Sequence, residues 1–153
     1  MAAKKAAAPD AIKLLKTDHE KVRTLLGQFE KATGARREKL RAQLDRELKV
    51  HTQIEEEIFY PAYREAARKK DDQKLYYEAI EEHHVVDLVL PEMNEGENNE
   101  ELKAKAKVLK ELVEHHADEE EKEMFPRAKK LLDKDQLRAL GEQMQLRKKT
   151  LMA

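Results

Sequence analysis

The chain has 153 residues, a length that fits one compact domain with a single core. Its 31 Lys and Arg residues are balanced by 32 Asp and Glu residues, and the formal charge of -1 argues against a nucleic-acid partner or a charged membrane surface. Because there is no cysteine, a disulfide framework, a thiolate nucleophile and a Cys-ligated zinc site are excluded.

The sequence also lacks the signals of a membrane or exported protein. No apolar run approaches the roughly 18 residues of a transmembrane helix. The N-terminal stretch MAAKKAAAPD lacks the Leu-rich apolar region of an export signal. We therefore expect a cytoplasmic protein with no membrane partner.

Composition and periodicity predict an all-α fold. Only four Gly and four Pro occur, in a sequence dominated by Ala, Leu, Lys, Glu and Arg. Apolar residues recur at helical spacing in four stretches, which cover residues 10–31, about 36–61, 76–93 and about 100–126. At Pro61 the second helix is expected to end, or to kink before an extension over 63–70. A last amphipathic segment, about 133–149, is expected to pack across one end of the bundle or to form a loosely docked tail.

Four helices of this length with short polar connections predict an up-down-up-down four-helix bundle. The bundle would span about 10–130, and the segment 133–149 would add a C-terminal helix. We treat residues 1–153 as a single domain. The four apolar stripes then meet in one interior.

Two stretches of the chain repeat one pattern of His, Glu and Pro. HTQIEEEIFYP at 51–61 is matched 65 residues later by HADEEEKEMFP at 116–126. In each, a Glu follows the His by four residues, so that the imidazole and the carboxylate can meet beside one helical turn. Nitrogen and carboxylate oxygen are ligands that borderline transition metals accept. The repeat therefore predicts a metal site.

Histidines interrupt the apolar stripe of every predicted helix. The six are His19, His51, His83, His84, His115 and His116. Burying four imidazoles and two carboxylates together is costly unless a cation compensates them. Six such ligands exceed the four of a structural zinc site, so two ions are expected. The ferritin-type scheme fails, because only one Glu-x-x-His motif, Glu81 to His84, is present.

These motifs resemble those of the haemerythrin-like, HHE cation-binding family. The resemblance runs from Asp10 to about Lys130, through Asp18-His19, H51-TQI-E55-EEIFYP, E82-H83-HVVDLVL and H116-ADE-E120-EKEMFP. It implies a four-helix bundle that holds two non-haem iron ions, a di-iron centre with an oxo or hydroxo bridge. It implies the ligands His19, His51, Glu55, His83, His116 and Glu120. Dioxygen, peroxide or nitric oxide would bind at the irons.

The strict 65-residue repeat pairs His19 with His84, but helical phase favours His83, which shares a face with apolar neighbours. The family's acid-His pairing agrees, so we choose His83 and keep His84 in reserve. Only His116 combines the Glu and Pro of the repeat, so His115 is expected outside the ligand set.

The family's oxygen carriers have a second His four residues further along the third helix, where this chain has Asp87. Reversible oxygen carriage therefore does not follow from the resemblance. Tyr60 and Tyr63 are expected in the core or at an interface, with a place beside the metal as the alternative. The four glutamates next to the predicted ligand Glu residues are either hydrogen-bond acceptors for the imidazoles or, more often, a solvated face; they are Glu56, Glu57, Glu119 and Glu121.

The leading functional hypothesis is a di-iron protein that binds or reduces hydrogen peroxide, dioxygen or nitric oxide, in defence against oxidative or nitrosative stress. If it turns over, catalase-like or peroxidase-like activity is expected. The alternatives are an oxygen or nitric oxide binding or sensing module, and iron storage or donation without turnover. A bundle that binds a protein or membrane surface, and a metal-free structural bundle, are the competitors from other classes. The oligomeric state stays open.

Overall fold

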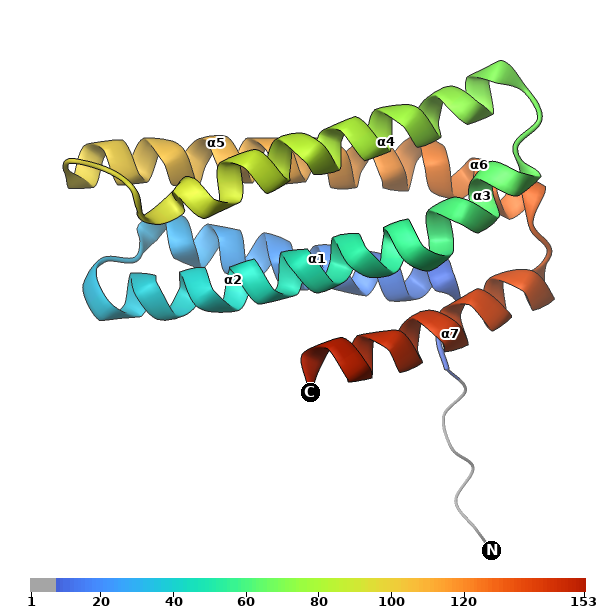
Figure 1. Ribbon diagram of the computed structural model, residues 1–153, viewed down its shortest axis with the longest axis horizontal. Helices are drawn as coiled ribbons and strands as arrows, with labels where there is room; N and C mark the ends of the chain where they lie inside the picture. Colours follow the sequence, from blue (N-terminus) through green and yellow to red (C-terminus); the bar gives the residue numbers. More distant parts are fainter. Residues whose placement is uncertain (1–7) are drawn as a thin grey trace, which may run out of the picture.

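A computed structural model describes residues 8–153, and all of its regular structure is helical (Figure 1). Residues 1–7 lie outside the described residues, and so does most of the stretch on which the expectation of no export signal rests. Within residues 8–153, no helix is both long and apolar enough to cross a membrane.

Four long helices make the bundle: α1 (Ala11–Lys31), α2 (Gly34–Ile54), α4 (Lys70–Val89) and α5 (Asn99–Glu119). α2 continues through a π-helical turn (Glu55–Phe59) into α3 (Tyr60–Ala66), and α5 continues through a second one (Glu120–Met124) into α6 (Phe125–Leu131). α4 ends in a 3₁₀ turn (Leu90–Asn94), and α7 (Lys134–Met152) follows α6.

The bundle has the predicted up-down-up-down arrangement, which confirms the expected fold class. In Figure 1 the connections α1–α2 and α4–α5 lie at one end, and α3–α4 and α6–α7 lie at the other. Side-chain caps fix where α1, α5 and α7 begin: Asp10, Asn98 and Asp133 each accept a hydrogen bond from a backbone N–H three residues on.

The second helix does not end at Pro61, contrary to the first of the two expectations. Pro61 and Pro126 each follow a π-helical turn in which an N–H donates five residues back, Tyr60 to Glu55 and Phe125 to Glu120. A proline ring would clash with the carbonyl four residues earlier in a regular α-helix. The wider turn lets the chain pass the proline while staying helical. Both π-helical turns begin at the Glu of the repeated motif.

The apolar core is divided into two clusters. One, which includes Leu15, Phe59 and Phe125, lies toward α3, α6 and α7. The other, which includes Leu44 and Leu109, lies toward the α1–α2 connection. α1, α2 and α4 contribute to both clusters, whereas α5 contributes to the second and its continuation into α6 to the first. Along each of these helical segments the metal-site histidine lies between the two contributions. The interior therefore contains a polar layer between two apolar ones.

The C-terminal segment is a helix, as predicted, but it does not cross the end of the bundle. α7 runs back beside α1 and α2 from the end at which α6 stops (Figure 1). Its Leu137 and Met144 are buried in the first apolar cluster. Gly141 allows the close approach, because a Cβ there would lie 2.2 Å from the carbonyl oxygen of Pro9. α7 is therefore packed against the bundle and is not a loose tail.

Candidate metal centre

The structure brings the six predicted ligand side chains together in the polar layer. α1, α2, α4 and α5 each supply one imidazole, and the two π-helical turns supply the carboxylates as their first residues. All six are buried: His19, His51, Glu55, His83, His116 and Glu120. They form two groups in which the possible ligand atoms lie within 4.8 Å of one another: His19, His51 and Glu120, and Glu55, His83 and His116.

Each carboxylate lies between two imidazoles and so connects the two groups. Oε1 of Glu55 lies 2.8 Å from Nε2 of His51 and 3.2 Å from Nε2 of His83. Oε1 of Glu120 lies 3.0 Å from Nε2 of His116 and 3.3 Å from Nε2 of His19. In this position a carboxylate can bridge two ions, one held by each group.

Several polar atoms in the layer make no hydrogen bond of acceptable geometry, although water does not reach them. This includes the two close pairs, Nε2 of His51 with Oε1 of Glu55 and Nε2 of His19 with Oε1 of Glu120. Among the described residues, the buried side-chain atoms without a partner are Nε2 of His19 and His51, both oxygens of Glu55, Oε1 of Glu120, and one guanidinium nitrogen of Arg41 outside the layer. Unsatisfied buried polar groups are rare and costly in folded proteins. Five atoms of this kind in one layer are explained by cations at the centre. The residues therefore fit a metal site.

A ring of outer carboxylates orients the imidazoles. Each imidazole turns Nδ1 away from the centre, toward an acid on a neighbouring helical segment. The four Nδ1-to-oxygen distances are 3.0 Å for His51 and Asp18, 3.1 Å for His83 and Glu56, 2.9 Å for His116 and Glu82, and 3.2 Å for His19 and Glu121. An Nδ1–H that donates outward leaves Nε2 as the free lone pair. The ring thus points all four Nε2 atoms at the centre.

The outer carboxylates follow a rule that the sequence contains. In α1 and α4 the outer carboxylate belongs to the residue immediately before the predicted ligand His. In the π-helical turns it belongs to the residue immediately after the predicted ligand Glu. Glu56 and Glu121 therefore have the hydrogen-bonding role that was the less favoured alternative. Glu57 instead pairs with Arg147 of α7 at 2.8 Å. Glu119 lies 3.4 Å from His115 at the surface.

The charges of the buried groups are strongly coupled. Burial disfavours the imidazolium of His51, but Glu55 and Asp18 outweigh this effect and raise its pKa to about 10. Burial is likewise outweighed at His116, where Glu120 raises the pKa well above its usual value. Burial favours the neutral acid at Glu55, yet His51 and its other neighbours lower that pKa well below its usual value. Without ions the centre therefore holds protons, which metal binding would displace.

Tyr60 is a further residue of the centre. It is fully buried, and its hydroxyl donates to Oε2 of Glu120 at 3.1 Å and lies 3.1 Å from Nε2 of His83. Burial and the Glu120 carboxylate raise the pKa of this hydroxyl well above its usual value. Tyr63 points elsewhere and donates to the carbonyl of Asp72 at 2.8 Å. Of the two tyrosines, only Tyr60 reaches the alternative place beside the metal.

His84, the alternative to His83, lies outside the centre, and so do Asp87 and His115. His84 and Asp87 are exposed on α4, one and four residues after the buried His83. His115 is 71% exposed on α5 and contacts the carboxylate of Glu82 at 3.5 Å. This placement agrees with the choice of His83 and His116 by helical phase and by the repeat.

A small cavity adjoins all four imidazoles. Its volume is about 20 Å³, enough for about one water-sized molecule. The remaining wall is largely aliphatic, and Arg23 and Thr52 complete it. The aliphatic residues are Val22, Leu48, Val86, Val113 and Ala117. A small neutral molecule therefore fits beside the inward-facing nitrogen atoms.

A helical bundle with buried His and carboxylate groups from every bundle helix defines a class of metal-binding proteins. The family model for the Hemerythrin HHE cation binding domain matches residues 10–128, and the chain belongs to this family. The crystal structure of a hemerythrin HHE cation binding domain-containing protein from Mycobacterium kansasii is similar, with a TM-score of 0.81 and 28% sequence identity. The match covers 94% of this chain and 87% of that one. A search of curated proteins found no match.

Proposed function

We propose that the chain is a non-haem di-iron protein that binds or reduces a small oxidant, namely hydrogen peroxide, dioxygen or nitric oxide. One observation carries the proposal: buried Nε2 and carboxylate atoms without hydrogen-bond partners converge from separate helical segments. The ligands would be His19, His51, Glu55, His83, His116 and Glu120. A place in oxidative or nitrosative stress defence follows from this chemistry.

The donor set favours two iron ions over a structural zinc. Mixed imidazole and carboxylate ligands suit iron, and carboxylates that connect two groups suit a pair of ions. Six protein ligands shared by two ions also leave coordination positions free. A closed zinc site would instead take four ligands around one ion.

The side chains around the centre have different roles. The outer carboxylates hold each imidazole in one tautomer, so that Nε2 keeps its direction through a redox change. Ferrous ions, when bound, supply the electrons that reduce the oxidant. The Tyr60 hydroxyl, between His83 and Glu120, is placed to donate a hydrogen bond or a proton to a molecule at the centre.

The aliphatic cavity supports a small, uncharged ligand. Hydrogen peroxide, dioxygen and nitric oxide are neutral and comparable in size to the water-sized molecule that the cavity accommodates. Valine and leucine side chains around it keep bulk water away from the imidazoles. A larger or charged substrate would not fit this space without a rearrangement.

The test uses the freshly isolated full-length chain. We expect two iron ions per chain by element analysis and an optical band from an oxo-bridged or hydroxo-bridged ferric pair. Without an added reductant, we expect consumption of hydrogen peroxide at many equivalents per chain with one dioxygen released for every two peroxides, because a second peroxide is then the reductant. Stoichiometric binding of nitric oxide or dioxygen without consumption of peroxide would assign binding or sensing in place of catalysis. A folded chain that takes up no iron would refute the proposal.

A further inference from the structure

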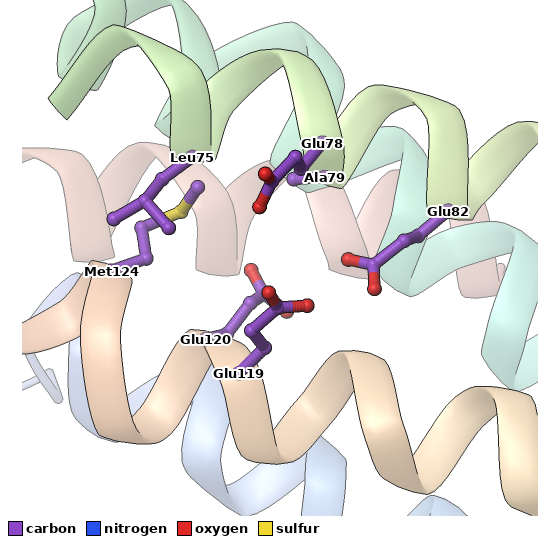
Figure 2. A pocket seen from close by; sticks show the side chains of 7 residues that line it. All are labelled: Leu75, Glu78, Ala79, Glu82, Glu119, Glu120 and Met124. Atoms are coloured by element: carbon purple, nitrogen blue, oxygen red, sulfur yellow. The ribbon is translucent and has the colours of Figure 1, made fainter. Parts of the chain in front are cut away.

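A second pocket approaches the centre from the side of α4 and shares no residue with the aliphatic cavity. Figure 2 shows the carboxylates of Glu78 and Glu82, from α4, facing those of Glu119 and Glu120 across it. Its volume is about 10 Å³, so it holds about one water-sized particle. His115 stands at its rim, and its Nε2 lies 3.5 Å from Glu82 and 3.4 Å from Glu119.

The exposure of the carboxylates decreases from the rim to the floor of this pocket. The side chain of Glu78 is 39% exposed, that of Glu119 28% and that of Glu120 only 2%. Glu120 also belongs to the metal centre, and its Oε1 is one of the buried atoms without a hydrogen-bond partner. The pocket thus connects solvent to a buried carboxylate of which one oxygen, Oε1, lacks a hydrogen-bond partner.

The possible ligand atoms in the pocket are close enough for one ion. Glu82, His115 and Glu119 form a group whose atoms lie within 4.8 Å of one another. Carboxylate oxygens can replace the water molecules that a divalent cation must shed before it enters a buried site. Among the described residues, the cation paired with Glu78 is Lys74, which is 73% exposed and 3.6 Å away, so it competes weakly.

From these observations we propose that the acidic pocket, formed by Glu78, Glu82, Glu119 and the floor carboxylate Glu120, is the loading route of the centre. A hydrated divalent cation first binds to Glu78 and Glu119. Carboxylate oxygens of the pocket then replace some of its water ligands, and the cation passes to Glu120. The aliphatic cavity is unsuited to this task, because its wall outside the imidazoles is mainly aliphatic and includes the cationic Arg23, so that a cation entering there would lose hydration with no carboxylate to replace it. Cations and neutral oxidants therefore reach the centre by different paths. This inference rests on the proposed metal centre.

The test follows the loading of the metal-free full-length chain with Co²⁺, whose visible spectrum reports its ligands. The key variant is Glu78→Gln/Glu119→Gln, which leaves Glu82 and Glu120 in place. Glu100→Gln/Glu111→Gln is the matched control, because it removes two carboxylates from exposed positions of α5. Loading rate, final Co²⁺ per chain and spectrum are measured at low and high salt.

We expect the key variant to load about tenfold more slowly at low salt, within the range by which local charge accelerates association. Its final Co²⁺ content and spectrum should equal those of the wild type, and the control should load at the wild-type rate. Release to a chelator should slow by the same factor, because entry and exit share the path. Single Glu119→Gln should have a smaller effect in the same direction.

Wild-type loading and release rates in the key variant would overturn the loading route while leaving the centre intact. Lower final Co²⁺ in that variant would also overturn it, because Glu78 or Glu119 would then belong to the centre itself. A wild-type chain that binds no Co²⁺ would refute the centre and the route together. The two failures are therefore distinguishable.

Discussion

At the residue scale, the centre depends on which nitrogen of each imidazole faces inward. The sequence contains the ligand types and their spacing, and helical phase is sufficient to separate His83 from His84. It does not predict that Asp18 bonds to His51 on the next helix, because that pairing depends on how two helices pack. The position of Tyr60 was left open for the same reason.

Neighbouring histidines on α4 provide a matched test of the ligand set. His83→Ala should lower the iron content from two ions per chain to one or fewer, because one group loses an Nε2 ligand. His84→Ala should keep both ions, since that imidazole is exposed. Element analysis, with circular dichroism as the control for folding, decides between them. Iron loss confined to the His84 variant would show that the assignment by helical phase is wrong.

Removal of a single hydroxyl tests the role of Tyr60. Tyr60→Phe loses the hydrogen bond to Glu120 and should reduce the free energy of unfolding by about 1 kcal/mol. Both irons should remain, because the six ligands are unchanged. We expect the visible spectrum of the ferric protein to change, since the hydroxyl lies beside His83 and Glu120. Identical spectra of variant and wild type would place Tyr60 in a purely structural role.

At the element scale, the two π-helical turns and α7 determine where the bundle departs from regular helices. The sequence predicts an interruption at Pro61, but local propensity does not distinguish a helix end from a widened turn. That outcome depends on tertiary packing: Phe59, the last residue of the first turn, and Phe125, the first residue after the second, are both buried in the core. The path of α7 likewise follows from tertiary contacts that an amphipathic pattern does not specify.

The contact between α7 and the start of α1 is testable at two glycines. Gly141→Ala should destabilise the protein by roughly 1–3 kcal/mol, because its Cβ would meet backbone atoms of Pro9, Asp10 and Ala11 at 2.2–2.8 Å. Gly27→Ala, in the middle of α1, has no neighbour within 4 Å and should stabilise by roughly 0.5–1 kcal/mol. Urea unfolding measures both values. Equal effects at the two sites would contradict the close packing of α7.

At the scale of the whole molecule, a polar layer separates two apolar clusters. α1, α2 and α4 cross all three, and α5 does so together with its continuation into α6. Composition and periodicity were sufficient to predict this bundle, because each helix alone shows its stripe and its interruption by His. We propose that residues 1–153 form one domain, since α7 contributes to the same apolar cluster as α1. The stability of such a layer depends on what neutralises its charges.

The stability of the metal-free protein should fall as pH rises above 6.5, whereas that of the metal-loaded protein should not. The pKa of His51 is about 10 in the fold, against roughly 6.5 in an unfolded chain. Its contribution is therefore complete below pH 6.5 and is lost as pH rises to 10, at up to about 1.4 kcal/mol per pH unit. The metal-loaded centre needs neutral imidazoles and should gain or keep stability over the same range.

Urea unfolding at pH 7 and pH 9 compares the two forms directly. We expect the free energy of unfolding of the metal-free protein to fall between these values, while that of the loaded protein does not. A metal-free protein whose stability rises from pH 7 to pH 9 would contradict the protonated, ion-paired centre.

The central claim is that two metal ions occupy the polar layer. Anomalous X-ray diffraction at the iron absorption edge, from crystals of the protein as isolated, tests it most directly. We predict two peaks roughly 3.5–4 Å apart, enclosed by His19, His51, Glu55, His83, His116 and Glu120. A well-ordered bundle with these side chains in place and no anomalous peak among them would contradict the account.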